Sequence, residues 1–438
     1  MEVHEGQSST GEDLISKLSD QLLSHIVSSL HIDEAVRTSV LSKRWKSVWR
    51  YAPKLEFNEK LMIKPLSRLL ESRSENTSHQ ERILNSYVDN GLINGQGILI
   101  YVLLYRHHGN VDSCRFVHFS ESMTILKQVQ NWIDFLVHHE NGIQDLYLEC
   151  EVPRSEYGNM AYIYKNMKLN FPPMLFASLQ TLELSNYVIE EISPFQGCQK
   201  LRTLKLRKVF ITDEILNGIL SNCEFLENFS IAWCGHYLPS LIIRNPILKF
   251  LELQQLSVNK IHVFADALVV LVLDTICCRA KNIVIDTASL RVFRCYYNTD
   301  RISAHSFGGD IHVLKTQEIF ESCAGPVGDR GVTYGINSSE EGLLPNHISK
   351  FWEARDQQGD YITPKLRSVY MKGFKGKEQE LEFVKYLITK ATKLEMLKII
   401  FGNYGRTREG VIATMNLLSL PRASVALAIV LKPGPNYV

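Results

Sequence analysis

The chain has 438 residues, enough for two or three domains, and its hydrophobic content of 45% is that of an ordinary globular protein. Its 48 basic and 47 acidic residues leave a formal net charge of +1, whereas nucleic-acid-binding proteins usually have a clear basic excess. The N-terminus is too polar for a secretory signal, and the apolar run from Gly97 to Tyr105 stops at nine residues, short of the about 18 to 20 that span a membrane.

The first predicted helix lies between Ser19 and Leu30, with Ser19 as its N-cap. Its apolar residues recur at the spacing of one helical stripe: Leu22, Leu23, Ile26, Val27 and Leu30. A second helical stretch is predicted after a cap at Asp33, and Pro53 ends it. Trp45 and Trp49 are predicted to share one face of that stretch.

Basic residues surround these tryptophans and are predicted to form a solvated helix face: Lys43, Arg44, Lys46 and Arg50. Three short helices cannot bury this many large apolar side chains among themselves. A partner is therefore expected, either another part of the chain or another protein.

The segment from Asp13 to Asn58 resembles a plant-type F-box. The resemblance rests on "LSDQLLSHI", on "AVRTSVLSKRW" and on the final pattern W-x-x-x-P-x-L-x-F. In that family these helices dock onto a Skp-type adaptor of a cullin ubiquitin ligase. The resemblance carries the adaptor-binding role to nine residues: Leu18, Leu22, Leu23, Ile26, Leu30, Val40, Leu41, Trp45 and Trp49.

One position departs from the F-box pattern, because Ser19 stands where the family usually has proline. Serine caps a helix well but removes an apolar contact, which predicts weaker adaptor binding. The alternative for the stripe is an internal core, and we prefer that interpretation for Val36 and Val48. The basic residues would complement an acidic adaptor.

The middle of the chain repeats the pattern L-x-x-L-x-L. Copies begin at Leu179, Leu201, Leu226, Leu248, Leu268 and Leu290, spaced 22, 25, 22, 20 and 22 residues apart. This spacing is typical of leucine-rich repeats, whose period is roughly 20 to 29 residues. Stacked repeats bury the leucines of parallel strands and form a solenoid. An earlier copy begins at Ile143, and Asp213 to Cys223 is predicted as a return helix.

Strand residues that alternate with the inward leucines face outward. Their mixture of charges and aromatic rings suits partner recognition, and an ordinary solvated sheet face is the alternative. Val270 and Val272 are predicted to be an exposed pair. The candidate target-binding residues are Glu183, Lys205, Arg207, Phe250, Glu252, Arg294 and Tyr296.

Both flanks of the repeats also resemble parts of plant F-box proteins. Thr124 to Leu148 resembles the segment that opens the repeat region, with a predicted helical face of Ile125, Val129, Trp132, Ile133 and Leu136. The C-terminal "GFKGKEQELEFVKYL", "LEMLKI" and "LPRAS" resemble the FBD domain. We expect this domain to continue or cap the repeat sheet.

The predicted fold class is an α/β leucine-rich-repeat solenoid, preceded by a small all-α F-box and followed by an α+β FBD-type domain. The predicted boundaries are a disordered tail at 1–12, the F-box at 13–58, a linker and irregular segment at 59–112, the repeats with their N-terminal cap at 113–324, a loop at 325–362 and the FBD domain at 363–438.

No catalytic site, metal site or cofactor is predicted. "GFKGK" lacks the spacing and the hydroxyl of a phosphate-binding loop. The pairs His107-His108 and His138-His139 are adjacent in sequence and cannot share a helical metal site at i and i+4. Nine scattered cysteines without a C-x-x-C are typical of reduced thiols in a nuclear or cytoplasmic protein.

The order of the modules predicts a non-catalytic substrate-recognition subunit of an SCF-type (Skp–cullin–F-box) ubiquitin ligase. Its partners would be a Skp-type adaptor, a cullin reached through that adaptor, and an unknown target protein. The alternative is a scaffold that sequesters its partner outside the ligase, for which Ser19 is the hint. We expect neither nucleic acid nor membrane as a partner, and a location in the nucleus or cytoplasm.

Overall fold

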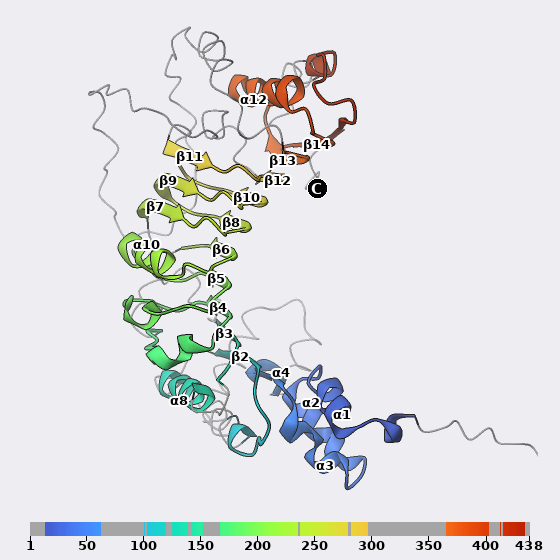
Figure 1. The fold of residues 1–438 in the computed structure, drawn as a ribbon, viewed down its shortest axis with the longest axis vertical. Helices are drawn as coiled ribbons and strands as arrows, with labels where there is room; N and C mark the ends of the chain where they lie inside the picture. The colour runs from blue at the N-terminus through green and yellow to red at the C-terminus, as the bar shows by residue number, and fades with distance from the viewer. Residues whose placement is uncertain are drawn as a thin grey trace, which may run out of the picture. The chain divides into compact units, whose positions relative to one another are not determined.

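Figure 1 shows the fold in a computed structural model. It describes residues 14–62, 100, 103–119, 125–137, 142–151, 167–234, 237–278, 282–296, 365–402, 412 and 415–433. The predicted tail at 1–12, most of the linker at 59–112 and the whole loop at 325–362 lie outside these residues. The chain divides into two compact units: Met1–Arg154 with Leu169–Thr181, and Ser155–Lys168 with Leu182–Val438.

Unit 1 begins with short helices. They are η1 (Ile15–Lys17), α1 (Asp20–Val27), α2 (Ile32–Arg37), η2 (Thr38–Val40), α3 (Trp45–Val48) and η3 (Trp49–Tyr51). The predicted first helix with Ser19 as its N-cap is confirmed as α1, because the Ser19 hydroxyl accepts a hydrogen bond from the backbone N–H of Leu22 at 3.3 Å. The predicted second helical stretch, from a cap at Asp33 to Pro53, is wrong in part. It is broken at η2, and Asp33 lies inside the first turn of α2 rather than at its cap.

The rest of unit 1 is a parallel β-sheet with one long helix. β1 (Lys54–Asn58), β2 (Ser113–Phe119) and β3 (Asp145–Glu151) pair in that order, and α4 (Glu59–Met62), α8 (Ile125–Val137) and η5 (Pro173–Ala177) complete the unit. The helix predicted from Ile125 is confirmed as α8, and four of its apolar residues are buried: Val129, Trp132, Ile133 and Leu136. The side chain of Ile125 lies outside the described part.

The helix α8 is anchored to the sheet by aromatic rings. The Trp132 ring stacks on Phe116 of β2 with centroids 4.9 Å apart, and Phe116 stacks on Phe57 of β1 at 5.2 Å. Large aromatic side chains supply much of the burial energy of a small core. This stack joins the last strand of the F-box-like segment to the first layers of the repeat region.

Unit 2 is built on a long row of parallel strands. They are β4 (Thr181–Ser185), β5 (Thr203–Arg207), β6 (Asn228–Ala232), β8 (Phe250–Gln254), β10 (Val270–Asp274), β12 (Val292–Tyr296), β13 (Ser368–Phe374), β14 (Met396–Phe401) and β15 (Ala428–Lys432), with the turn η6 (Ser193–Phe195) after β4. Each repeat strand begins two residues after the first leucine of its L-x-x-L-x-L copy, and the leucines are buried. The predicted repeats are thereby confirmed.

A second parallel sheet, absent from the sequence-based expectation, lies behind this row. It consists of β7 (Leu238–Arg244), β9 (Val258–Phe264) and β11 (Ile283–Asp286), in the order β11-β9-β7. Figure 1 shows this shorter row of strands to the left of β8, β10 and β12, with α10 (Asp213–Asn222) next to β7. The repeat core is therefore enclosed between two sheets here.

The helix α10 closes the free edge of β7. Asn217 of α10 donates its side-chain N–H to the carbonyl of Ser240 at 3.1 Å and accepts from the backbone N–H of Ile242 at 2.9 Å. Its amide therefore satisfies backbone groups that a neighbouring strand would otherwise pair. The predicted return helix is confirmed, with Leu216, Ile219 and Leu220 buried.

One left-handed residue follows each of five successive repeat strands. Asn186, Lys208, Trp233, Gln255 and Thr275 have φ between 48° and 63°. Asparagine tolerates this conformation, whereas tryptophan and the β-branched threonine do so at a cost of about 1 to 2 kcal/mol. The turn out of each strand is therefore imposed by the stacking of the repeats.

The FBD-like strands continue the repeat sheet, as expected. β13 pairs with β12 in parallel, and Leu366 and Leu394 occupy the position of the first leucine of a repeat. The helix α12 (Glu378–Lys390) lies between β13 and β14. The buried carboxylate of Glu380 accepts hydrogen bonds from the backbone N–H groups of Lys375 at 3.0 Å and Lys377 at 2.8 Å. These amides of "GFKGK" are therefore part of the capping box at the start of α12.

Candidate functional site

The F-box-like helices display large apolar side chains to solvent. Besides the ring of Tyr51, six aliphatic side chains are more than half exposed: Leu14, Ile15, Leu22, Ile26, Val40 and Leu41. Leu22 and Ile26 are one helical turn apart on α1, so they share a face. Exposure of this much apolar surface within so short a segment marks a protein-interaction site.

The nine predicted adaptor-binding residues separate into surface and core. Leu22, Ile26, Leu30, Val40 and Leu41 are exposed, and Leu18 and Trp45 are half-buried.

Leu23 and Trp49 are 0% and 4% exposed, so in this structure they belong to the core of the F-box-like segment and not to its surface. They face inward because the helices fold onto each other at these positions, where α1 meets η3 and α3. Val48 is buried and Val36 half-buried.

Sequence reasoning overlooked Leu14 and Ile15, which extend the exposed apolar residues to η1. The sequence contains a signal for their exposure. Two apolar residues shortly before the first motif residue, Leu18, precede α1 and so cannot be part of its apolar stripe.

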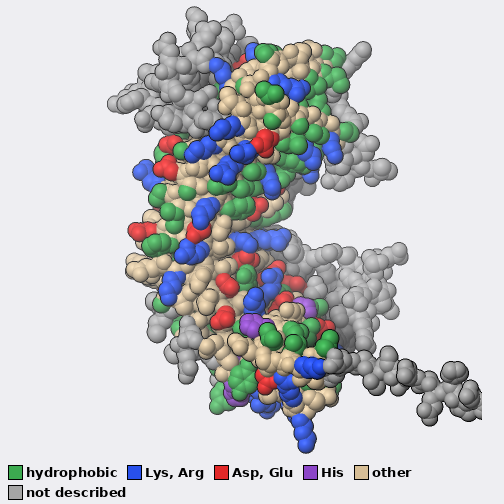
Figure 2. Space-filling model, turned by 45° about the vertical axis from the view of Figure 1, so that its right-hand side comes forward, with side chains coloured by type: hydrophobic (Ala, Val, Ile, Leu, Met, Phe, Trp, Pro, Cys, Tyr) green, Lys and Arg blue, Asp and Glu red, His purple; other side chains and the backbone are tan. Residues whose placement is uncertain are grey.

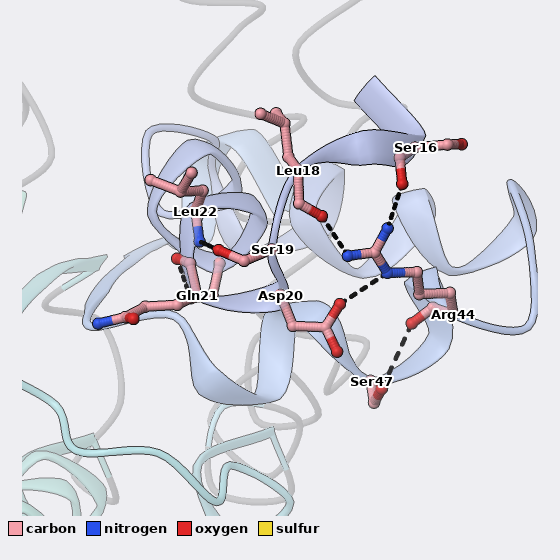
Figure 3. Close-up of polar contacts among 9 residues, drawn as sticks. Ser16, Leu18, Ser19, Asp20, Gln21, Leu22, Arg44 and Ser47 are labelled. Carbon is pink, nitrogen blue, oxygen red and sulfur yellow. Dashed lines mark hydrogen bonds and ion pairs between the residues drawn. The ribbon is translucent and has the colours of Figure 1, made fainter. Parts of the chain in front are cut away.

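Arg44 ties the start of the segment together, as Figure 3 shows. Its guanidinium donates through Nε to the Asp20 carboxylate at 2.7 Å, through Nη1 to the Ser16 carbonyl at 2.8 Å, and through Nη2 to the Leu18 carbonyl. The prediction of a wholly solvated basic face is therefore wrong for Arg44. The clamp positions η1 and the first turn of α1, and with them Leu18 and Leu22.

The second candidate surface is the outward face of the main sheet in unit 2, on the side opposite β7, β9 and β11. All seven predicted target-binding residues are exposed or half-buried there. Lys205 pairs with Glu183 at 2.5 Å, and Glu252 accepts a hydrogen bond from Ser230 at 2.8 Å. Val272 is only 5% exposed, so its predicted exposure is wrong. Figure 2 shows Lys and Arg interspersed with Asp and Glu over most of the face in view.

The outward face gains residues from the FBD-like strands that sequence reasoning overlooked. Tyr296 of β12 lies beside Tyr370 of β13, with ring centroids 5.3 Å apart, and Lys398 Nζ of β14 lies 5.1 Å from the centre of the Tyr370 ring. Burial raises the pKa of the Tyr296 phenol. The sequence signal that could have predicted these residues is the match of "LRSVYM" and "LEMLKI" to the repeat pattern, which places Tyr370 and Lys398 at outward strand positions.

In the part of the chain that the structure describes, no three His, Cys, Asp or Glu side chains are grouped to hold a metal ion, and no helix has the length and apolar character to cross a bilayer. The buried Cys198 and Cys223 thiols are hydrogen-bonded, which lowers the pKa of Cys198 and raises that of Cys223. Both lie in the repeat core.

Comparison with known proteins agrees with this architecture. Family models match in chain order: the F-box domain at 15–57, the LRR repeats of FBD-associated F-box protein At5g56370 at 129–311, and FBD at 362–399. The chain belongs to the plant F-box/FBD/leucine-rich-repeat family. F-box and leucine-rich-repeat domains are typical of non-catalytic adaptor proteins, and an F-box suggests binding to a Skp-type adaptor.

Proteins of Arabidopsis thaliana with F-box or F-box/FBD/LRR-repeat names are similar to this chain. F-box protein At1g80960 is 25% identical over 445 residues, covering 88% of this chain and 83% of the relative. F-box/FBD/LRR-repeat protein At1g13570 is 23% identical over 426 residues, covering 88% and 91%. F-box/FBD/LRR-repeat protein At3g26920 is 28% identical over 263 residues, covering 58% and 48%.

Proposed function

We propose that this protein is the substrate-recognition subunit of an SCF-type ubiquitin ligase. The F-box docks onto a Skp-type adaptor, which joins it to a cullin, and the outward face of unit 2 captures a target protein. The observation that carries the proposal is the exposure of Leu22, Ile26, Val40 and Leu41 on the F-box helices. Such side chains gain roughly 1.5 to 3 kcal/mol each when a partner buries them.

In this proposal the protein has no catalytic residues of its own. It holds a target lysine near the thioester of a ubiquitin-carrying enzyme, so its contribution to the rate is proximity. The order of F-box, repeats and FBD domain supports this division of labour. The nucleus and the cytoplasm, where this machinery works, are the expected locations.

The direct test is co-expression of the full chain with several Skp-type adaptor paralogues. We expect a stoichiometric complex that survives size-exclusion chromatography, and ubiquitin transfer when cullin and the conjugating enzyme are added. A folded full chain that binds none of the paralogues would refute the ligase role and favour a scaffold that sequesters its partner.

Ser19 is the observation that favours this second candidate, and the structure suggests how to test it. Ser19 has φ of −67° and follows an extended Leu18 with ψ of 147°, so the backbone already accepts the proline that the family usually has. We expect Ser19→Pro to tighten adaptor binding several-fold, because the ring adds apolar contact. The measurement is the dissociation constant by isothermal titration calorimetry.

The matched control for this change is Ser19→Ala, which also loses the cap on Leu22 but adds no ring. Ser19→Ala should destabilise α1 by about 1 kcal/mol without tightening the complex. Equal affinities of the proline variant and the wild type would show that Ser19 does not limit adaptor binding.

A further inference from the structure

Four strands at the C-terminal end of unit 2 carry a basic and aromatic surface on their outward face. We call it the basic strip: Arg294, Tyr296, Tyr370, Lys372, Lys398 and Lys432. Strand register places Arg294, Tyr370 and Lys398 side by side on β12, β13 and β14, and Tyr296, Lys372 and Lys432 on the neighbouring row. The strip joins the last repeat to the FBD domain.

The basic strip differs from the earlier strands of the face in having no acidic residue on its own strands, although Arg207 of β5 also has no ion pair among the described residues. On the earlier strands Lys205 is neutralised by Glu183, and at their N-terminal edge Arg202 and Lys249 both pair with Glu227. Within the described residues no ion pair involves Arg294, Lys398 or Lys432, and no Asp or Glu stands at an outward position of β12 to β15. Asp274 of β10 lies beside Tyr296 in register, and the described strands of the strip itself carry an excess of positive charge that an acidic partner would complement.

An aromatic ring holds one cation of the strip, Lys398, at the surface. Lys398 Nζ lies 5.1 Å from the centre of the Tyr370 ring, in the range of a cation–π interaction, and Tyr370 itself packs against Tyr296 at 53°. An ammonium group already held over a ring loses less conformational entropy when it binds an anion. The strip thus combines fixed positive charge with rigid aromatic surface, the composition of many protein-recognition sites.

We propose that the basic strip binds an acidic, extended segment of the target protein, with carboxylates spread along its length. This inference rests on the proposed function and specifies its target. The cations are distributed over four strands about 4.8 Å apart, which suits a row of carboxylates. A single phosphate would instead call for cations converging on one point.

The test is fluorescence anisotropy of the full chain with a labelled peptide of alternating glutamate and serine, which presents all its carboxylates on one side when extended. The reference probe has glutamine in place of glutamate. We expect binding of the glutamate peptide only, weakening as salt is raised. Arg294→Gln with Lys398→Gln should lower the affinity at least roughly tenfold.

The matched control is Arg202→Gln with Lys249→Gln, which removes the same two types of cation from unit 2 outside the strip. This pair should bind the peptide as the wild type does. Equal loss in both double variants, or no loss in the strip variant, would overturn the proposal. So would tighter binding of a serine-phosphorylated peptide, or of single-stranded DNA, of the same charge.

Failure of this inference can be distinguished from failure of the proposed function. The strip variant should still co-purify with the Skp-type adaptor, because its substitutions leave the F-box unchanged. A chain that binds the adaptor but not the peptide would overturn only the inference that the target carries an acidic segment. A chain that binds the peptide but no adaptor would overturn only the ligase role.

Discussion

Replacing Leu22 and Ile26 with aspartate should abolish adaptor binding while leaving the F-box folded. The two side chains are 53% and 51% exposed on α1 and share one face, so neither supports the core. Because about half of each side chain remains to be buried, their loss removes roughly 1.5 to 3 kcal/mol of apolar burial in the complex, and the new carboxylates must be desolvated as well. We expect affinity to fall by more than about a hundredfold. Co-purification and calorimetry measure the loss, and circular dichroism checks the fold.

Two further substitutions make this result specific. Leu23→Asp alters the next residue along the chain, but its side chain is 0% exposed, so this change should unfold the F-box rather than block a surface. Val425→Asp places the same charge on a fully exposed apolar residue just before β15, far along the chain from the F-box, and should leave adaptor binding intact. Retained binding by the Leu22 and Ile26 double variant would exclude this face of α1 from the interface.

Trp132→Ala should lower the free energy of unfolding of unit 1 by about 3 to 5 kcal/mol. The ring is fully buried between α8 and the sheet and continues the stack of Phe116 and Phe57. Alanine would leave a cavity at the junction of three elements that cannot collapse without moving α8. Urea unfolding followed by circular dichroism measures the change, and the transition of unit 1 should shift to lower urea.

A second tryptophan provides the control for this prediction. Trp233 is 43% exposed in the turn after β6, and Trp233→Ala should change stability by no more than about 0.5 kcal/mol. A similar loss in both variants would mean that burial of Trp132 is not what stabilises unit 1.

The sequence alone predicts the modules, their order and the strands of the repeats. The F-box motif and the L-x-x-L-x-L copies are local patterns, and each repeat strand begins where its copy places it. This success has a physical reason: the leucine spacing itself sets which side chains can be buried between neighbouring repeats. The cap at Ser19 is equally local, because a hydroxyl three residues before a helical N–H suffices for it.

The tertiary structure decided which residues of these patterns reach solvent. Leu22 and Leu23 are indistinguishable in hydropathy, and only the contact of α1 with α3 and η3 places Leu23 inside and leaves Leu22 outside. Trp45 begins α3 and is half-buried, whereas Trp49 begins the 3-10 helix η3 and is buried, so the two rings that the sequence places on one face differ in exposure. Arg44 became a clamp because the fold brings its guanidinium to carbonyls more than twenty residues earlier.

The second sheet and the basic strip also depend on the fold. No local sequence pattern predicts that β7 pairs with β9 and β9 with β11. These strands form the second layer that covers the buried leucines of the main sheet. The strip unites Arg294 with Tyr370 and Lys398, which lie more than seventy residues further along the chain, because β13 pairs with β12. Sequence spacing determines what a strand can bury, whereas strand order in the sheet decides which surface residues become neighbours.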